Sequence, residues 1–346
     1  MRYMIGRPRQ FFLFWILAGS LGAFPFVAPA QTVDPEPHSI TIETNVQGTL
    51  VFSSSRKPDE NKLILWILSG RELRSSAIAG VNPVLTSDGK FIIFKRGDEI
   101  RQADIRSKRD EILGVSKISG VYAFDLAPNG QKVCFNTVRI SADGLNGFNL
   151  HIINLDGSDL RCLTGFPSDD INGINNPKWS PDGNNILFTA FDPSEQKGQR
   201  NVHLWTIRQD GTALKKITGE ISKYSVNEPA WSPDGKQIVF VARSEPARPE
   251  DYELYICNVD GSNVRQLTDN DWNEREPVFS PDGKQICFVS YRHQKVGMAG
   301  YGSELFLINI DGTGEKRLTP PQKLSHALGG WSEDHSPTWA PRSAPL

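Results

Sequence analysis

The sequence predicts an all-β fold, a six-bladed β-propeller whose blades are four-stranded antiparallel sheets. The first observation is a motif, Pro-x-Trp/Phe-Ser-Pro-Asp-Gly, that occurs at residues 177–183, 229–235 and 277–283. The second is an apolar segment ending in phenylalanine after each copy, followed further on by Asp-Gly-Ser/Thr. A unit this short cannot bury its own faces, so the repeated units must stack on one another.

Three weaker copies of the motif extend the pattern to six. Residues 83–89 and 124–130 keep the turn but lose the tryptophan, and residues 337–343 restore it near the end of the chain. Successive copies lie about 40 to 60 residues apart, the spacing of propeller blades with connections of unequal length. The repeat therefore predicts both the architecture and the number of blades.

Each expected strand has its own pattern. The inner strand carries Pro-x-Trp, and Ser-Pro-Asp-Gly joins it to the second strand, because proline fixes φ, aspartate bonds back to the backbone and glycine adopts a left-handed conformation. Asp-Gly joins the third strand to the fourth in the same way. The second strands are expected to end at Phe52, Phe94, Phe135, Phe188, Phe240 and Phe288.

The order of the motifs also predicts how the ring closes. The set of strands near Phe52 has no Ser-Pro-Asp-Gly turn before it, and the segment from Pro337 has no strands after it. We therefore expect the C-terminal strand to complete the first blade, which removes two open sheet edges. The alternating residues 39–44 are the competing candidate for that inner strand.

The first thirty residues have the composition of a secretory signal peptide. Arg2, Arg7 and Arg9 precede the apolar residues 11–18, and residues 28–30, Ala-Pro-Ala, provide a cleavage site. The expected organisation is a signal peptide at 1–30, a lead-in at 31–47 that could supply an extra strand, and the propeller at 48–346. The protein is then periplasmic or secreted, with no membrane insertion after cleavage; the alternative is an uncleaved anchor.

The composition excludes several classes of function. A formal net charge of −2 without a long basic run argues against nucleic-acid binding. Because Gly-x-Ser-x-Gly, His-Glu-x-x-His, Cys-x-x-Cys and phosphate-binding loops are missing from the sequence, we expect neither a serine peptidase nor a cofactor. The four cysteines are expected to be buried free thiols, with one bridge between Cys257 and Cys287 as the alternative.

Binding residues are expected on one face of the ring. Antiparallel strands place the short repeated turns on one face, the short-turn face, and the longer connections at 192–200, 243–251 and 291–301 on the other, the long-loop face. Polar residues near the inner-strand prolines should ring the channel mouth: Asn82, Asn176, Asn227, Glu228, Arg275, Glu276, Asp334 and His335. Trp272 and Trp331 are candidate stacking platforms, and a hydrated channel without a ligand is the alternative.

These repeats resemble the TolB-like propeller family, from about Gly48 to Ser343. TolB is a periplasmic protein of the Tol–Pal system in the cell envelope, with an α/β domain before its propeller. The lead-in at 31–47 is too short for such a domain, so we expect the propeller alone here, and the resemblance implies a habit of binding partners. The repeats are also similar to the propellers of prolyl-peptidase-type hydrolases and of oligogalacturonate lyases.

The leading functional hypothesis is an exported, non-enzymatic, monomeric propeller that binds a protein or peptide of the cell envelope through its long-loop face and channel mouth. The alternative is a carbohydrate-binding protein or a metal-dependent lyase acting on a polysaccharide. For a lyase metal, the sequence offers Asp334, His335 and His293 as candidate ligands.

Overall fold

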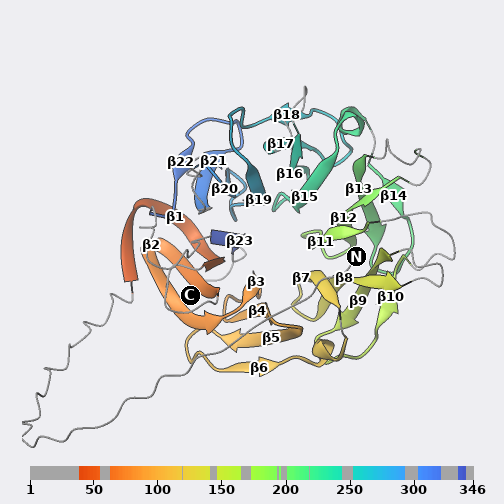
Figure 1. Ribbon diagram of the computed structural model, residues 1–346, viewed down its shortest axis with the longest axis horizontal. Helices are drawn as coiled ribbons and strands as arrows, with labels where there is room; N and C mark the ends of the chain where they lie inside the picture. The colour runs from red at the N-terminus through yellow and green to blue at the C-terminus, as the bar shows by residue number, and fades with distance from the viewer. Residues whose placement is uncertain are drawn as a thin grey trace, which may run out of the picture. The chain divides into compact units, whose positions relative to one another are not determined.

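The computed structural model describes residues 39–54, 63–118, 120–140, 146–164, 173–192, 195, 201–217, 219–243, 252–292, 303–320 and 334–339. All of the described residues belong to one compact unit, His38–Leu346. In this unit, six antiparallel sheets surround a central axis, as Figure 1 shows. The six-bladed propeller is confirmed, whereas the predicted signal peptide lies outside the described residues.

Blade 1 contains β23, β1 and β2, and blades 2 to 6 take four consecutive strands each from β3 to β22. The innermost strands are β23 (Asp334–Trp339), β3 (Val81–Leu85), β7 (Val121–Leu126), β11 (Asn175–Trp179), β15 (Val226–Trp231) and β19 (Glu274–Phe279). The second strands are β1 (Ser39–Ser54), β4 (Phe91–Arg96), β8 (Lys132–Ile140), β12 (Asn185–Phe191), β16 (Gln237–Arg243) and β20 (Gln285–Ser290).

The two outer positions differ in strand length. The third strands are β2 (Ile64–Ala79), β5 (Glu99–Asp104), β9 (Asn146–Asn154), β13 (Val202–Arg208), β17 (Tyr252–Asn258) and β21 (Glu304–Asn309). The outermost strands are β6 (Asp110–Ile112), β10 (Arg161–Cys162), β14 (Lys215–Lys216), β18 (Arg265–Gln266) and β22 (Lys316–Arg317). Two 3₁₀ turns, η1 (Gly114–Lys117) and η2 (Glu220–Lys223), complete the described elements. Such short outer strands leave little open edge for unwanted pairing.

The core lies between the blades and contains the predicted phenylalanines. Phe52, Phe94, Phe135, Phe188, Phe240 and Phe288 are all fully buried. Each lies on a second strand, which is covered on both faces by the neighbouring blades, so its apolar residues run almost without interruption. Among the described residues, no helix has the length and apolar character needed to span a bilayer.

The Ser-Pro-Asp-Gly turns are held by their own side chains. In blade 5, Ser232 Oγ donates to Asp234 Oδ1 at 2.7 Å and accepts from the backbone N–H of Gln237 at 2.9 Å. The backbone N–H of Lys236 also donates to Asp234, and Gly235 has a φ of 71°. Blades 2, 4 and 6 repeat this arrangement. The repeated aspartates are therefore turn formers, as the sequence predicted.

The C-terminal strand β23 closes the ring, as predicted. It pairs antiparallel with β1, Leu50 lying opposite Trp339 and Ser54 opposite Asp334. Residues 39–41 pair instead with Glu72–Arg74 of β2, so they extend the second strand and do not form an inner strand. The end of β2 turns back along the start of β2: Ser76 Oγ donates to Leu65 O at 2.7 Å, and Gly80 N–H donates to Leu63 O at 2.9 Å. The returning residues take the outer position of blade 1.

Neighbouring blades also meet through their short turns. A Cβ added to Gly183, Gly235 or Gly283 would contact the ring of Pro128, Pro181 or Pro233, each in the preceding blade. At the closure, Pro281 of blade 6 lies in the same way against Gly48 of blade 1. In each of these four pairs, the proline belongs to one blade and the glycine to the next blade in chain order, with blade 1 following blade 6.

One side-chain prediction needs correction. All four cysteines are free, but Cys162 is exposed, because β10 is an outermost strand; Cys134, Cys257 and Cys287 are buried as expected. Burial raises the pKa of the Cys257 thiol to about 12. Among the tryptophans of the inner strands, Trp179 is buried, whereas Trp231 and Trp339 are half-buried against core clusters.

Candidate binding site in the central channel

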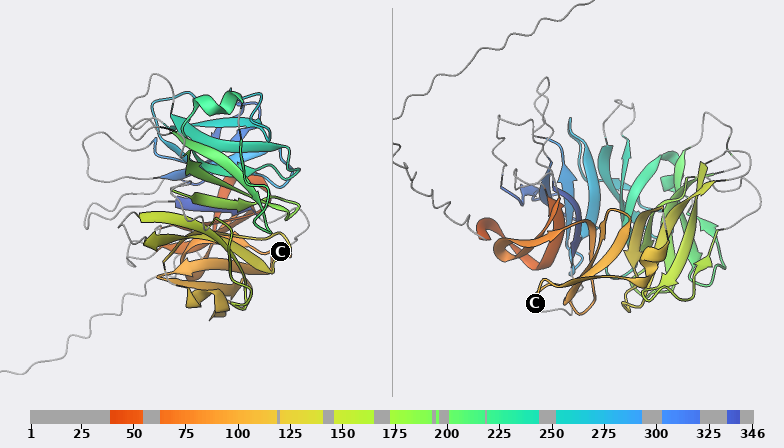
Figure 2. Two further views of the ribbon diagram at one scale, coloured as in Figure 1. Left: turned by 90° about the vertical axis from the view of Figure 1, so that its right-hand side faces the viewer. Right: turned by 60° about the horizontal axis from the view of Figure 1, so that its bottom comes forward.

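A cavity of about 830 Å³ occupies the centre of the ring. Its wall is made by the innermost strands of all six blades, together with side chains from β4 and β17. Figure 2 shows the blades from two further sides, with their strands running between the two faces of the ring. A volume of this size lies in the range of ordinary ligand sites, about 300–1,000 Å³.

A β-bulge at the inner-strand proline directs side chains toward the cavity. Proline has no N–H to donate to the ladder, and the pairing register shifts at this point in β3, β11, β15, β19 and β23. The residue before each proline has a left-handed φ of 49° to 52°: Asn82, Asn176, Glu228, Glu276 and Ser336. All five line the cavity. Backbone of this kind costs about 1–3 kcal/mol per residue and is concentrated at functional sites in proteins.

Blade 3 departs from this pattern. Phe124 replaces the proline in β7, and neither of the preceding two residues has a positive φ. Within this bulge, the backbone N–H of Ala123 donates to Asn136 Oδ1 at 2.8 Å. The side chain of Tyr122 remains 58% exposed and lines the cavity.

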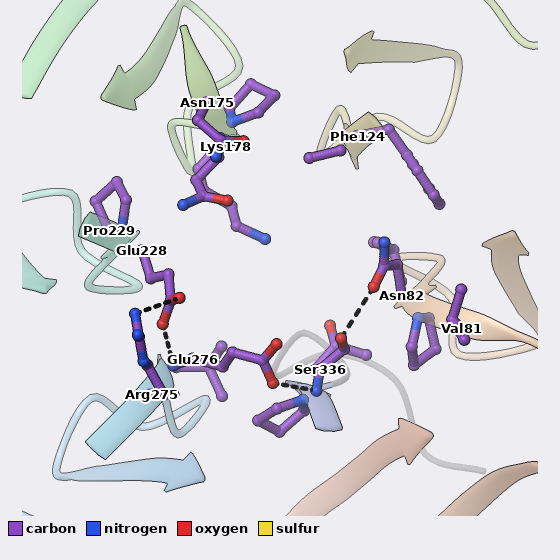
Figure 3. Close-up of a pocket in the computed structure, with 18 of the residues that line it drawn as sticks. Val81, Asn82, Phe124, Asn175, Lys178, Glu228, Pro229, Arg275, Glu276 and Ser336 are labelled. Atoms are coloured by element: carbon purple, nitrogen blue, oxygen red, sulfur yellow. Dashed lines mark hydrogen bonds and ion pairs between the residues drawn. The ribbon is translucent and has the colours of Figure 1, made fainter. Parts of the chain in front are cut away.

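The bulge residues are linked from blade to blade (Figure 3). Glu228 Oε2 accepts from the backbone N–H of Glu276 at 2.7 Å, and Glu276 Oε2 accepts from the backbone N–H of Ser336 at 2.5 Å. Ser336 Oγ then donates to Asn82 Oδ1 at 3.0 Å. The links run through blades 5, 6, 1 and 2 and so cross the point where the C-terminal strand closes the ring.

Arg275 neutralises part of this acidic wall. Its Nη1 lies 3.3 Å from Glu228 Oε1, and its guanidinium lies 4.1 Å from the ring centre of Tyr252, within cation–π range. Burial raises the pKa of Glu228, with Arg275 opposing and Glu276 reinforcing that shift. The arginine is thus held between a carboxylate and an aromatic face at the channel wall.

The basic part of the wall comes from other blades. Lys95, from β4, donates to the backbone carbonyl of Val121 at 2.5 Å. Lys178, from β11, has its ammonium 4.0 Å from Asp125 Oδ1, beyond hydrogen-bond distance. Burial raises the pKa of Asp125, which also accepts from the backbone N–H of Trp179 at 2.8 Å. Lys178 and Lys95, from blades 4 and 2, therefore line the same cavity as Glu228 and Glu276, from blades 5 and 6.

The structure brings six of the ten predicted site residues together on one cavity wall. Asn227, Glu228, Arg275 and Glu276 line the cavity, as do Asn82 and Asn176. His335 lies behind them, with Nδ1 3.9 Å from Glu276 Oε2. Trp272 is 36% exposed in the connection before β19 and does not line the cavity. Trp331, His293 and the side chain of Asp334 lie outside the described residues.

Sequence reasoning missed several residues of the wall, among them Ser336, Lys178, Lys95 and Tyr252. Ser336, not Asp334 or His335, directly precedes the inner-strand proline of blade 1, and an alignment on Pro337 would have found it. Lys178 occupies the x of Pro-x-Trp, where the other described copies have alanine, valine, threonine or aspartate. Lys95 and Tyr252 come from outside the inner strands and have no signal in the motif. Among the described residues, no three His, Cys, Asp or Glu side chains are grouped so as to hold a metal ion.

A second polar cluster lies at the beginning of β19. Glu274 is completely buried; its Oε1 accepts from Asn270 Nδ2 at 3.0 Å and lies 3.0 Å from Arg292 Nη2. Arg292 also binds Glu315 and lies 4.0 Å from the ring centre of Phe306. Burial raises the pKa of Glu274 despite the arginine. This cluster lies inside blade 6 and supports the connection next to the channel mouth.

Comparison with solved structures supports the fold. TolB from Acinetobacter baumannii aligns with a TM-score of 0.65 at 19% identity, covering 86% of this chain and 68% of that one. An oligogalacturonate lyase from Vibrio parahaemolyticus aligns with a TM-score of 0.52 at 11% identity, covering 77% and 73%. At such identities the likeness shows the propeller fold alone.

Comparison with curated sequences reaches only part of each relative. Dipeptidyl-peptidase 5 from Porphyromonas endodontalis is 28% identical over 168 residues, which are 47% of this chain and 22% of that protein. The chain spans less than half the length of the curated relatives it matches.

The family is shown by the repeats themselves. The model of the TolB β-propeller domain, PD40, matches residues 146–334, more than half of the chain. That match includes all three full copies of the turn motif and three of the six inner-strand bulges. The chain therefore belongs to the TolB β-propeller domain family.

Proposed function

We propose that this protein is an exported, non-enzymatic propeller that binds a protein or peptide of the cell envelope through its long-loop face and channel mouth. The observation that carries the proposal is the ring of bulge residues, in which five strained backbone positions direct polar side chains into one cavity. The inner strands begin at the long-loop face, so the bulges near their starts lie toward that face. Membership of a family named after TolB supports a binding role.

The polar wall suits an extended segment better than a globular surface. Backbone and side-chain groups of Asn82, Asn176 and Asn227 can donate and accept, while Glu228 and Arg275 supply charge of both signs. An extended peptide presents N–H and C=O groups along its whole length, and such groups need partners when they leave water. Tyr122 and Tyr252 add aromatic surface to the same cavity.

The test exchanges the charges of the pair at the mouth. Glu228→Lys combined with Arg275→Glu keeps an ion pair between blades 5 and 6 but reverses its direction. We expect the folded double variant to lose capture of the partner from envelope extract, with a changed salt dependence of any binding that remains. Circular dichroism and thermal melts establish beforehand that the variant is folded.

The matched control reverses charge on the other face. Lys236 and Lys284 are exposed on the short turns that join the first and second strands of blades 5 and 6. The control, Lys236→Glu with Lys284→Glu, changes the net charge of the protein, whereas the exchange at the mouth leaves it unchanged. The control is therefore the larger electrostatic change. Capture should survive it. Loss of the partner in this control, with retention in the mouth variant, would place the binding surface on the short-turn face.

A further inference from the structure

The cavity has charges of opposite sign on different blades. Lys178 extends into it from blade 4, and Glu276 extends into it from blade 6, as Figure 3 shows. The two inner strands are separated in the ring by β15, the inner strand of blade 5. The two side chains thus approach the cavity from different directions and do not form an ion pair with each other.

Each of the two charges has capacity for a ligand. Among the described residues, the nearest carboxylate to the Lys178 ammonium is Asp125 at 4.0 Å, and burial raises the pKa of that carboxyl group. Glu276 uses Oε2 to accept from Ser336, whereas Oε1 has no hydrogen-bond partner in the described part of the chain. Both side chains are about one-third exposed, at 36% and 32%.

The remaining charged side chains of the wall already have partners, and its other residues are uncharged, either polar or apolar. Glu228 is paired with Arg275 at 3.3 Å, and Lys95 donates to the carbonyl of Val121. Asn82, Asn176 and Ser336 contribute amide and hydroxyl groups between the charges. A ligand that satisfies this wall carries one negative group, one positive group and hydrogen-bonding groups between them.

We propose that the channel binds the zwitterionic form of a short peptide, with its carboxylate on Lys178 and its ammonium on Glu276. This proposal rests on the proposed function and names the chemistry of its ligand. The backbone amides between the two peptide termini hydrogen-bond to the asparagine and serine side chains of the wall. The cavity volume of about 830 Å³ accommodates a peptide of a few residues and is large for a single amino acid.

The test uses tri-alanine with free termini, its N-acetylated form, its C-amidated form and the doubly blocked form, measured by calorimetry with the full-length protein. We expect the free peptide to bind most tightly. Each block should weaken binding about tenfold, because it removes one charge-assisted hydrogen bond. The blocks leave the residues of the peptide unchanged, and the variants below assign each difference to one charged side chain.

Two variants assign each peptide terminus to a residue. Lys178→Gln should abolish discrimination against the C-amidated peptide and leave discrimination against the N-acetylated one. Glu276→Gln should do the reverse, and its amide oxygen can still accept from the Ser336 N–H, so the ring closure is preserved. Lys236→Gln, on the short-turn face, is the control that should change neither preference.

Several results would overturn this proposal. Equal binding of all four peptides, or no binding of tri-alanine, would exclude recognition of the termini. Tight binding of tri-galacturonate that needs Lys178 and is indifferent to Glu276→Gln would identify an acidic saccharide as the ligand. If the peptides fail while the charge exchange at Glu228 and Arg275 still abolishes capture, the proposed function stands and only this inference falls.

Discussion

The carboxylate of Glu276 accepts a hydrogen bond from the backbone N–H of Ser336 at 2.5 Å, between two strands that are neighbours in the ring but sixty positions apart in the chain. Ser336 lies on the C-terminal strand, which pairs with the second strand of blade 1. The contact therefore joins the last complete blade to the strand that closes the first. The wall of the candidate site and the closure of the ring share this residue pair.

Removal of residues 336–346 should destabilise the whole ring. The deletion takes away most of β23, including Trp339, which packs against the core cluster of blades 1 and 6, and it exposes the edge of β1. We expect the melting temperature to fall by about 10 °C or more, or the protein to aggregate. Deletion of residues 340–346 alone keeps β23 and should melt close to the full-length protein. Equal melting of both truncations would show that β23 is dispensable.

Trp179 should be the most costly tryptophan to truncate among those described on the inner strands. It is buried, so Trp179→Ala should lower the free energy of unfolding by about 3–5 kcal/mol. Trp231→Ala should cost less, since that side chain is half-buried. Trp272→Ala, on an exposed connection, should change stability by only about 0.5 kcal/mol. Denaturant midpoints provide the measurement, and the reverse order would contradict the assignment of the core.

The buried carboxyl group of Glu274 should give a pH-dependent stability. Burial raises its folded pKa above the ordinary 4.5, so its contribution is fully present below about pH 4.5 and is lost as the pH rises through the folded pKa. Glu274→Gln does not titrate. The stability of this variant relative to the natural protein should therefore increase between about pH 4 and pH 8. Melting temperatures across that range measure the difference, and parallel profiles would argue against the shift.

Asp260 provides a control of opposite sign. Hydrogen bonds from Ser262 lower its pKa below 3.8, so its stabilising effect is present at neutral pH and is lost as the pH falls through the lowered value. Asp260→Asn should therefore become relatively less stable as the pH rises. Together, the two variants distinguish the pH dependence of stability caused by a buried carboxyl group from that caused by a carboxyl group in a turn.

The cysteines should divide into one reactive and three protected thiols. Cys162 is exposed on an outermost strand, whereas Cys134, Cys257 and Cys287 are buried, and burial raises the pKa of Cys134 and Cys257. Because the thiolate is the reactive form, a thiol reagent at neutral pH should label one cysteine quickly in the native protein and all four after denaturation. Mass spectrometry of the labelled peptides identifies the sites. Rapid labelling of Cys257 would contradict the described burial.

The sequence predicted the fold well because the repeat encodes local geometry. Ser-Pro-Asp-Gly forms its turn with its own side chains, and the phenylalanines lie on second strands that any ring of sheets must bury, although each strand continues past its phenylalanine. The site was predicted only in part. Glu228 and Glu276 were found because they precede a motif proline, but Lys95 and Tyr252 reach the cavity from strands whose register depends on tertiary packing. The pairing of residues 39–41 with β2 likewise depends on a hairpin that no motif marks.

The proline-to-glycine contacts on the short-turn face have a consequence for genetics. Pro233 belongs to blade 5, but the glycine it touches, Gly283, belongs to blade 6. A substitution at Pro233 should therefore disturb the packing of blade 6, the next blade along the chain. Second-site suppressors of such a lesion should map to blade 6 and not to blade 4, and suppressors of a lesion at Pro281 should map to the beginning of the propeller, around Gly48.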